Sequence, residues 1–98
     1  MITGITESGF EFRIPEGLAE DFRFVIAYKD IRSGDTEKML DATIRLVSVV
    51  FADDDEEKRF YEHLAEKNGG RVPSTVLFKE LFDIITQASG KDRAIKNC

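Results

Sequence analysis

Apolar and charged side chains alternate along residues 10–14, a pattern typical of a half-buried β-strand. A similar short run covers residues 2–6, and the glycine-containing stretch 7–9 between the two runs predicts a β-hairpin. Pro15 ends the second strand because proline has no N–H to donate. A lone hairpin is only marginally stable in water, so we expect residues 1–15 to cover one end of a helical core.

From residue 18 onward, apolar residues recur at the three- and four-residue spacing of amphipathic helices. Asp35 or Thr36 can act as an N-cap for the second helix, and the Asp53-x-x-Glu56 arrangement can cap the third. The first two predicted helices cover about residues 18–31 and 37–51. The third follows the cap at Asp53 and is closed by Asn68-Gly69-Gly70, and the fourth is opened by Val72-Pro73 and interrupted near its end by Gly90. The sequence therefore predicts one mainly α domain over residues 1–98, with an N-terminal β-hairpin, a bundle of about four helices over 18–90 and a flexible tail over 91–98.

The second helix carries more apolar surface than a helix at the edge of a bundle needs. One row consists of Leu40, Ile44, Val47 and Phe51, and a neighbouring row consists of Met39, Thr43, Leu46 and Val50. We interpret the first row as the main core row. The apolar residues of the second and fourth helices that lie off the main core rows are then candidates for binding a partner: Met39, Leu46, Val50, Phe78 and Phe82. The alternative is that these residues are buried under the hairpin and the third helix, and self-association is compatible with both interpretations.

The charge balance argues against nucleic acid as a partner. The 98 residues include 14 Lys and Arg against 19 Asp and Glu, a formal charge of -5, whereas phosphate binding needs a basic surface. No stretch approaches the roughly 20 apolar residues of a membrane span, and no leader segment is evident. Cys98 is the one cysteine, so no disulfide can form within the chain, which fits a reducing, cytosolic compartment.

None of the residues with reactive side chains forms a recognisable catalytic or metal-binding pattern. The acidic run 53–57 lacks the glycine of a calcium loop, and its place at a helix N-terminus explains its charge. His63 is the one histidine and has no partner in the sequence for a triad or a zinc site. Gly70 is followed by Arg71 rather than by the Lys-Ser/Thr pair of a phosphate-binding loop. We therefore expect no catalytic activity, no metal and no cofactor.

Six short landmarks occur in order along nearly the whole chain. They are "TESGFEF" at 6–12, "AEDFRF" at 19–24, "GD" at 34–35, "FYEHL" at 60–64, "GGRVP" at 69–73 and "IKN" at 95–97. Taken together, they resemble the small tail assembly chaperones of long-tailed bacteriophages (siphoviruses). The chain departs from the pattern of that family at the more basic "YKDIRSGD" segment, 28–35, and at Cys98.

The resemblance implies a non-catalytic protein of the host cytoplasm that binds the phage tape measure protein, keeps it soluble and helps to recruit tail tube subunits. It also implies the possibility of a longer form made by a frameshift near the end of the gene. A groove that accepts an apolar helical stripe would suit such a client, and excess acidic charge would keep the complex soluble. Two alternatives stay open: a structural component of the virion such as a head–tail connector, and a small regulatory protein that binds a host protein through its acidic surface.

Overall fold

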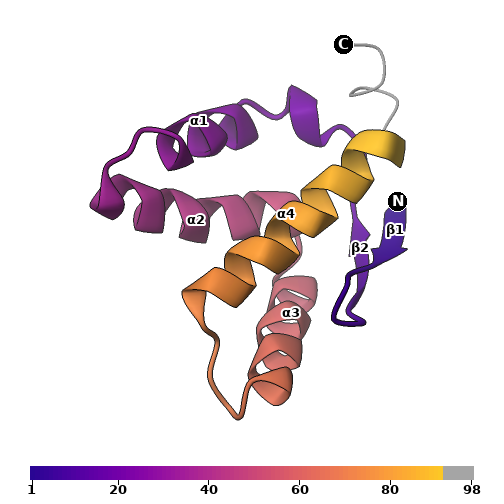
Figure 1. The fold of residues 1–98 in the computed structure, drawn as a ribbon. Helices are drawn as coiled ribbons and strands as arrows, with labels where there is room; N and C mark the ends of the chain where they lie inside the picture. Colours follow the sequence, from indigo (N-terminus) through magenta and orange to yellow (C-terminus); the bar gives the residue numbers. More distant parts are fainter. Residues whose placement is uncertain (92–98) are drawn as a thin grey trace.

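The computed structural model describes residues 1–91, and it confirms a mainly α fold with an N-terminal β-hairpin (Figure 1). The elements in chain order are β1 (Ile2–Ile5), β2 (Glu11–Ile14), a short 3-10 helix (Leu18–Glu20), α1 (Phe22–Ile31), α2 (Thr36–Phe51), α3 (Asp54–Lys67) and α4 (Ser74–Lys91). Gly90, where the sequence predicted an interruption, lies within α4, which runs on to Lys91. The predicted flexible tail lies, from residue 92 on, outside the described residues, and so does Cys98.

The hairpin is antiparallel and pairs Ile2 with Ile14 at its open end. Its turn is closed by two backbone hydrogen bonds of 2.9 Å, from the Thr6 N–H to the Phe10 carbonyl and from the Gly9 N–H to the Thr6 carbonyl. Gly9 has a φ of 93°, a conformation that glycine adopts without steric cost. The predicted alternation is confirmed, because Phe10, Phe12 and Ile14 are buried while Glu11 and Arg13 face solvent.

Aspartate side chains set the starts of three helices. Asp35 accepts a hydrogen bond from the Lys38 N–H, and Asp53 accepts from the N–H groups of the first turn of α3, as the sequence predicted. The prediction of a single helix over 18–31 is wrong in its first turn. Asp21 is extended there, with φ -78° and ψ 113°, and its carboxylate caps the Arg23 N–H, so the 3-10 helix and α1 are separate elements.

The helices form two unequal parts (Figure 1). The hairpin, α3 and α4 surround the C-terminal half of α2, where the rings of Phe10, Phe51 and Phe60 meet with centroids 5.1 to 6.2 Å apart. Leu46, Val50, Leu81 and Ile84 complete this core, and each is at most 1% exposed. The helix α1 lies outside it and packs chiefly along α2.

Within residues 1–91, none of the helices combines the length and the apolar composition needed to cross a membrane.

Candidate protein-interaction surface

The core side of α2 combines residues of both predicted rows. Val47 and Phe51 of the predicted core row are buried, but so are Leu46 and Val50 of the neighbouring row. Leu46 and Val50, predicted to contact a partner, are 0% and 1% exposed. Leu40 and Ile44, predicted to be core, are 51% and 63% exposed. The assignment of Leu46 and Val50 to a binding surface is therefore wrong: α4 and β2 pack on α2 and cover that row.

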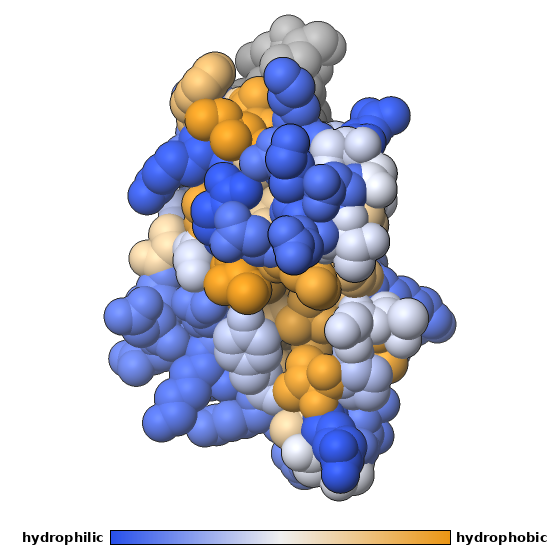
Figure 2. Space-filling model, turned by 90° about the vertical axis from the view of Figure 1, so that its left-hand side faces the viewer, coloured by the Kyte–Doolittle hydropathy of each residue, from blue (hydrophilic) through white to orange (hydrophobic). Residues whose placement is uncertain are grey.

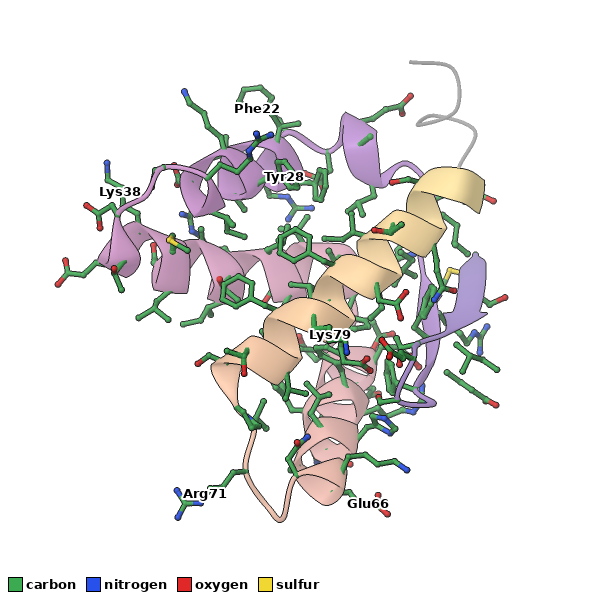
Figure 3. All side chains as sticks on the ribbon, in the orientation of Figure 1. Phe22, Tyr28, Lys38, Glu66, Arg71 and Lys79 are labelled. Carbon is green, nitrogen blue, oxygen red and sulfur yellow. The ribbon has the colours of Figure 1, made fainter. Side chains whose placement is uncertain are left out.

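The other three predicted residues, Met39, Phe78 and Phe82, are half-buried. Phe78 and Phe82 stack with their ring planes 8° apart and their centroids 6.1 Å apart. Tyr28 of α1 meets Phe82 edge-on at 6.3 Å, and Phe24 lies 5.8 Å from Tyr28. Phe78 and Phe82 thus form one half-exposed aromatic row with Tyr28 and Phe24, and this row crosses from α4 to α1. Figure 3 shows Tyr28 pointing toward α4.

The helix α1 buries very little of its own apolar surface. Ala27 is its one fully buried residue, while Phe22 is 71% exposed and Val25 and Ile26 are also exposed. These three residues, together with Leu40 and Ile44 of α2, are hereafter called the α1–α2 face. Ile26 and Ile44 line one cleft and Leu40 and Ile44 line another, while Phe22 points outward from α1, away from α2 (Figure 3). The residues of the α1–α2 face account for five of the seven large hydrophobic residues that are exposed among those described; the other two, Met1 and Ile5, lie at the hairpin.

The α1–α2 face is hollowed on both sides of Ile44. A cleft of about 320 Å³ is lined by Ile26 of α1 and by Ile44 and Val49 of α2. A second cleft of about 420 Å³ lies between Leu40, Ile44 and Phe78. Figure 2, which views the molecule from the side of the α1–α2 connection, shows hydrophobic surface above and below a band of hydrophilic side chains. Arg23, Arg45 and Ser48 complete the lining of the first cleft, whereas most residues of the second are aliphatic or aromatic. Apolar surface with polar groups beside it suits an amphipathic helix.

Two side chains that line these clefts, Arg45 and Tyr61, have shifted pKa values. Arg45 donates a hydrogen bond of 2.8 Å to Asp30, and this hydrogen bond is the main cause of the raised pKa of the Arg45 guanidinium. In the second cleft, burial, reinforced by the nearby Glu57 carboxylate, raises the pKa of the Tyr61 phenol. The Tyr61 hydroxyl, which is uncharged at neutral pH even at its ordinary pKa of 10.0, therefore stays protonated into more alkaline solution.

A polar cluster that sequence reasoning missed lies at the opposite end of the core. Glu80 of α4 is 3% exposed, and its Oε1 accepts hydrogen bonds from the Thr6 hydroxyl, at 2.6 Å, and from the Ser8 hydroxyl. The Ser8 Oγ also lies 2.9 Å from Nε2 of His63 on α3. The signal in the sequence was a glutamate within the apolar stripe of the fourth helix, between Leu77 and Ile84.

This cluster does not have the arrangement of a nucleophilic triad. In a triad the imidazole stands between the acid and the hydroxyl and removes its proton. Here the Ser8 hydroxyl stands between Glu80 and His63, and its hydrogen points to the carboxylate. The cluster instead holds the hairpin turn to α3 and α4. Among residues 1–91, no group of His, Cys, Asp and Glu has the geometry to hold a metal ion.

Comparison with known proteins assigns no family to this chain. No family model matches it, and neither the characterised proteins nor the solved structures include a match. The α1–α2 face is therefore interpreted from its own geometry and chemistry.

Proposed function

We propose that this protein is a non-catalytic tail assembly chaperone of a long-tailed bacteriophage, which binds the phage tape measure protein and keeps it soluble. The observation that carries the proposal is the α1–α2 face, because large apolar side chains grouped on one pair of helices are a common mark of a binding surface. The order of the sequence landmarks, from Thr6 to Asn97, supports the choice of client.

The proposed contact is an amphipathic helix of the client laid across α1 and α2. Fully burying a large apolar side chain contributes about 1.5–3 kcal/mol, so covering five partly exposed ones contributes on the order of 5 kcal/mol before the costs of association. Because association itself costs at least about 4 kcal/mol, this contribution supports only a weak, reversible complex and not a permanent one. A chaperone that must release its client to the tail tube needs that balance.

Acidic residues keep such a complex dispersed in the host cytoplasm. The formal charge of -5 opposes clustering of several chaperones on one client. Tail tube subunits are a second expected partner. Self-association through the same face in the absence of client would protect the apolar residues until the client is made.

Co-expression with the tape measure protein of the same phage tests the proposal. We expect the client to stay soluble and to elute with the chaperone from a size-exclusion column. Ile44→Asp should abolish both effects, because it places a charge between the two clefts. The matched control is Ile5→Asp, since Ile5 is 59% exposed but lies on β1, away from the α1–α2 face. Circular dichroism melting verifies that both variants fold.

Two results would count against the proposal. If wild-type protein leaves the client insoluble, or if Ile44→Asp and Ile5→Asp impair binding equally, the α1–α2 face is not the chaperone surface. Mass spectrometry of purified virions separates a chaperone from a connector or other virion component, because a chaperone is absent from the finished particle.

A further inference from the structure

A wide hollow of about 730 Å³ opens beside the α1–α2 face, along α1 and the start of α2. Its apolar wall is made by Phe24, Val25 and Tyr28 of α1. The hollow therefore continues the apolar surface already described, since Val25 belongs to the α1–α2 face and Tyr28 to the aromatic row. The charged residues on its rim are mainly cationic, whereas the protein as a whole is acidic.

Three cations stand on this rim: Lys29, Arg32 and Lys38. All three are exposed, and the Arg32 guanidinium lies 5.9 Å from the centre of the Tyr28 ring. Within residues 1–91, none of the ion pairs involves any of these three side chains. Asp30 is the one carboxylate in the lining, and its charge is taken up by Arg45 at 2.8 Å.

Helix stability does not explain the whole cluster. Lys29 and Arg32 lie at the C-terminal end of α1, where the helix dipole favours cations. Lys38 lies in the first turn of α2, where the dipole favours anions instead. Residues 22–51 contain five basic and four acidic residues, whereas the remainder of the chain contains nine basic and fifteen acidic ones. Residues 22–51 therefore carry a net charge of +1, whereas the remainder of the chain carries -6.

We infer that the α1–α2 face takes an amphipathic helix whose apolar stripe is flanked by carboxylates. The stripe lies on the apolar wall of the hollow, made by Phe24, Val25 and Tyr28, and its acidic flank meets Lys29, Arg32 and Lys38 on the rim. The inference rests on the proposed function, because it specifies the chemistry of the client segment. The net charge of the whole protein would lead to the opposite expectation, because a charge of -5 favours a basic partner.

A matched pair of synthetic helical peptides of about 18 residues tests the inference directly. Both peptides carry leucines at i, i+3, i+4 and i+7 spacing; one has glutamates beside the stripe and the other has lysines. By fluorescence anisotropy at low salt, we expect the glutamate peptide to bind about tenfold more tightly, because several exposed ion pairs each contribute modestly. In about 1 M salt, where the screening length is about 3 Å, the two affinities should converge.

Lys38→Glu is the diagnostic variant, because an acid in the first turn of α2 suits the helix dipole and the fold should tolerate it. We expect it to lower the preference for the glutamate peptide about threefold. Arg71→Glu is the matched control: it changes the net charge equally, but Arg71 lies in the α3–α4 connection and points away from α1 (Figure 3). It should leave the preference unchanged.

Equal affinity for the two peptides, or tighter binding of the lysine peptide, would overturn the inference. A tape measure protein that is held equally by wild type and by Lys38→Glu would overturn it too, while leaving the proposed chaperone function intact. A wild-type protein that prefers the glutamate peptide but retains no tape measure protein would support the inferred chemistry and reject the proposed client. Self-association that no peptide displaces would make a second copy the occupant and overturn the inference.

Discussion

Replacing Glu80 probes how the hairpin is held to the helices. This carboxylate is buried, and no cation pairs with it among residues 1–91. It is instead stabilised by the hydroxyl groups of Thr6 and Ser8, which belong to the hairpin turn. We predict that Glu80→Ala destabilises the fold and frees the turn from α4.

Two opposing effects set the size of the loss. A hydrogen bond to a charged group contributes about 1.5–3 kcal/mol, so the two hydroxyls together give about 3–6 kcal/mol. Burial of the carboxylate offsets part of this gain, because a buried charge without an ion partner costs free energy. We therefore expect Glu80→Ala to lower the free energy of unfolding by about 3 kcal/mol, and Glu80→Gln, which keeps an acceptor oxygen, by about 1 kcal/mol. For a domain of this size, the alanine variant should melt about 15 °C lower.

Urea denaturation followed by circular dichroism measures these losses. A double-mutant cycle with Ser8→Ala should give a coupling free energy of about 1 kcal/mol or more. Glu7→Ala is the control, because Glu7 is an exposed acid in the same turn, 3.3 Å from Lys79, and its loss should change stability by less than about 0.5 kcal/mol. A Glu80→Leu variant as stable as wild type would refute the reasoning, because desolvation of the carboxylate would then outweigh its hydrogen bonds.

Three further predictions concern other parts of the fold. Leu46→Ala should lower the free energy of unfolding by about 3 kcal/mol in urea denaturation, whereas Leu40→Ala should cost under about 1 kcal/mol, because only Leu46 is buried. Gly4→Ala should cost about 2 kcal/mol in the same assay, because the added methyl would lie 2.6 Å from the Phe12 ring. Hydrogen bonding from the Arg23 side chain lowers the pKa of the Asp21 carboxyl below its usual 3.8, so the stabilising effect of this cap is present above that value and is lost as the pH falls through the lowered pKa. An NMR titration should record that lowered pKa, and Arg23→Ala should raise it; an unchanged Asp21 titration would show that the Arg23 contact does not form in solution.

The four helices and the hairpin could be predicted because their signals are local. Turn residues, aspartate caps and the spacing of apolar side chains all lie within a few positions of the structure that they specify. Asp35 and Asp53 cap the helices that follow them, as expected. The break at Asp21 was missed because the apolar spacing runs on through it, and only the capping contact with Arg23 shows where α1 begins.

The candidate surface could not be predicted in full because the orientation of α2 is a tertiary property. Apolar side chains lie on more than one side of this helix, so the sequence pattern alone does not say which side faces the core. The packing of α4 and the hairpin decides that Leu46 is buried and Ile44 is exposed. Phe78 and Phe82 remain at the surface because α1 reaches α4 through Tyr28 without covering them. The hollow is lined by residues of α1 and by Lys38 at the start of α2. The packing of the two helices brings these residues together, and the sequence pattern does not specify that packing.

The hydrogen bonds between the hairpin turn and α4 join segments that are far apart in the chain. Thr6 is 74 positions from Glu80, and the Ile5 carbonyl accepts from Gln87, 82 positions further along the chain. During translation the hairpin turn therefore cannot gain these bonds until Gln87 has left the ribosomal exit tunnel. Until then the Thr6 hydroxyl and the Ile5 carbonyl remain in water, and the hairpin has only the earlier helices to pack against.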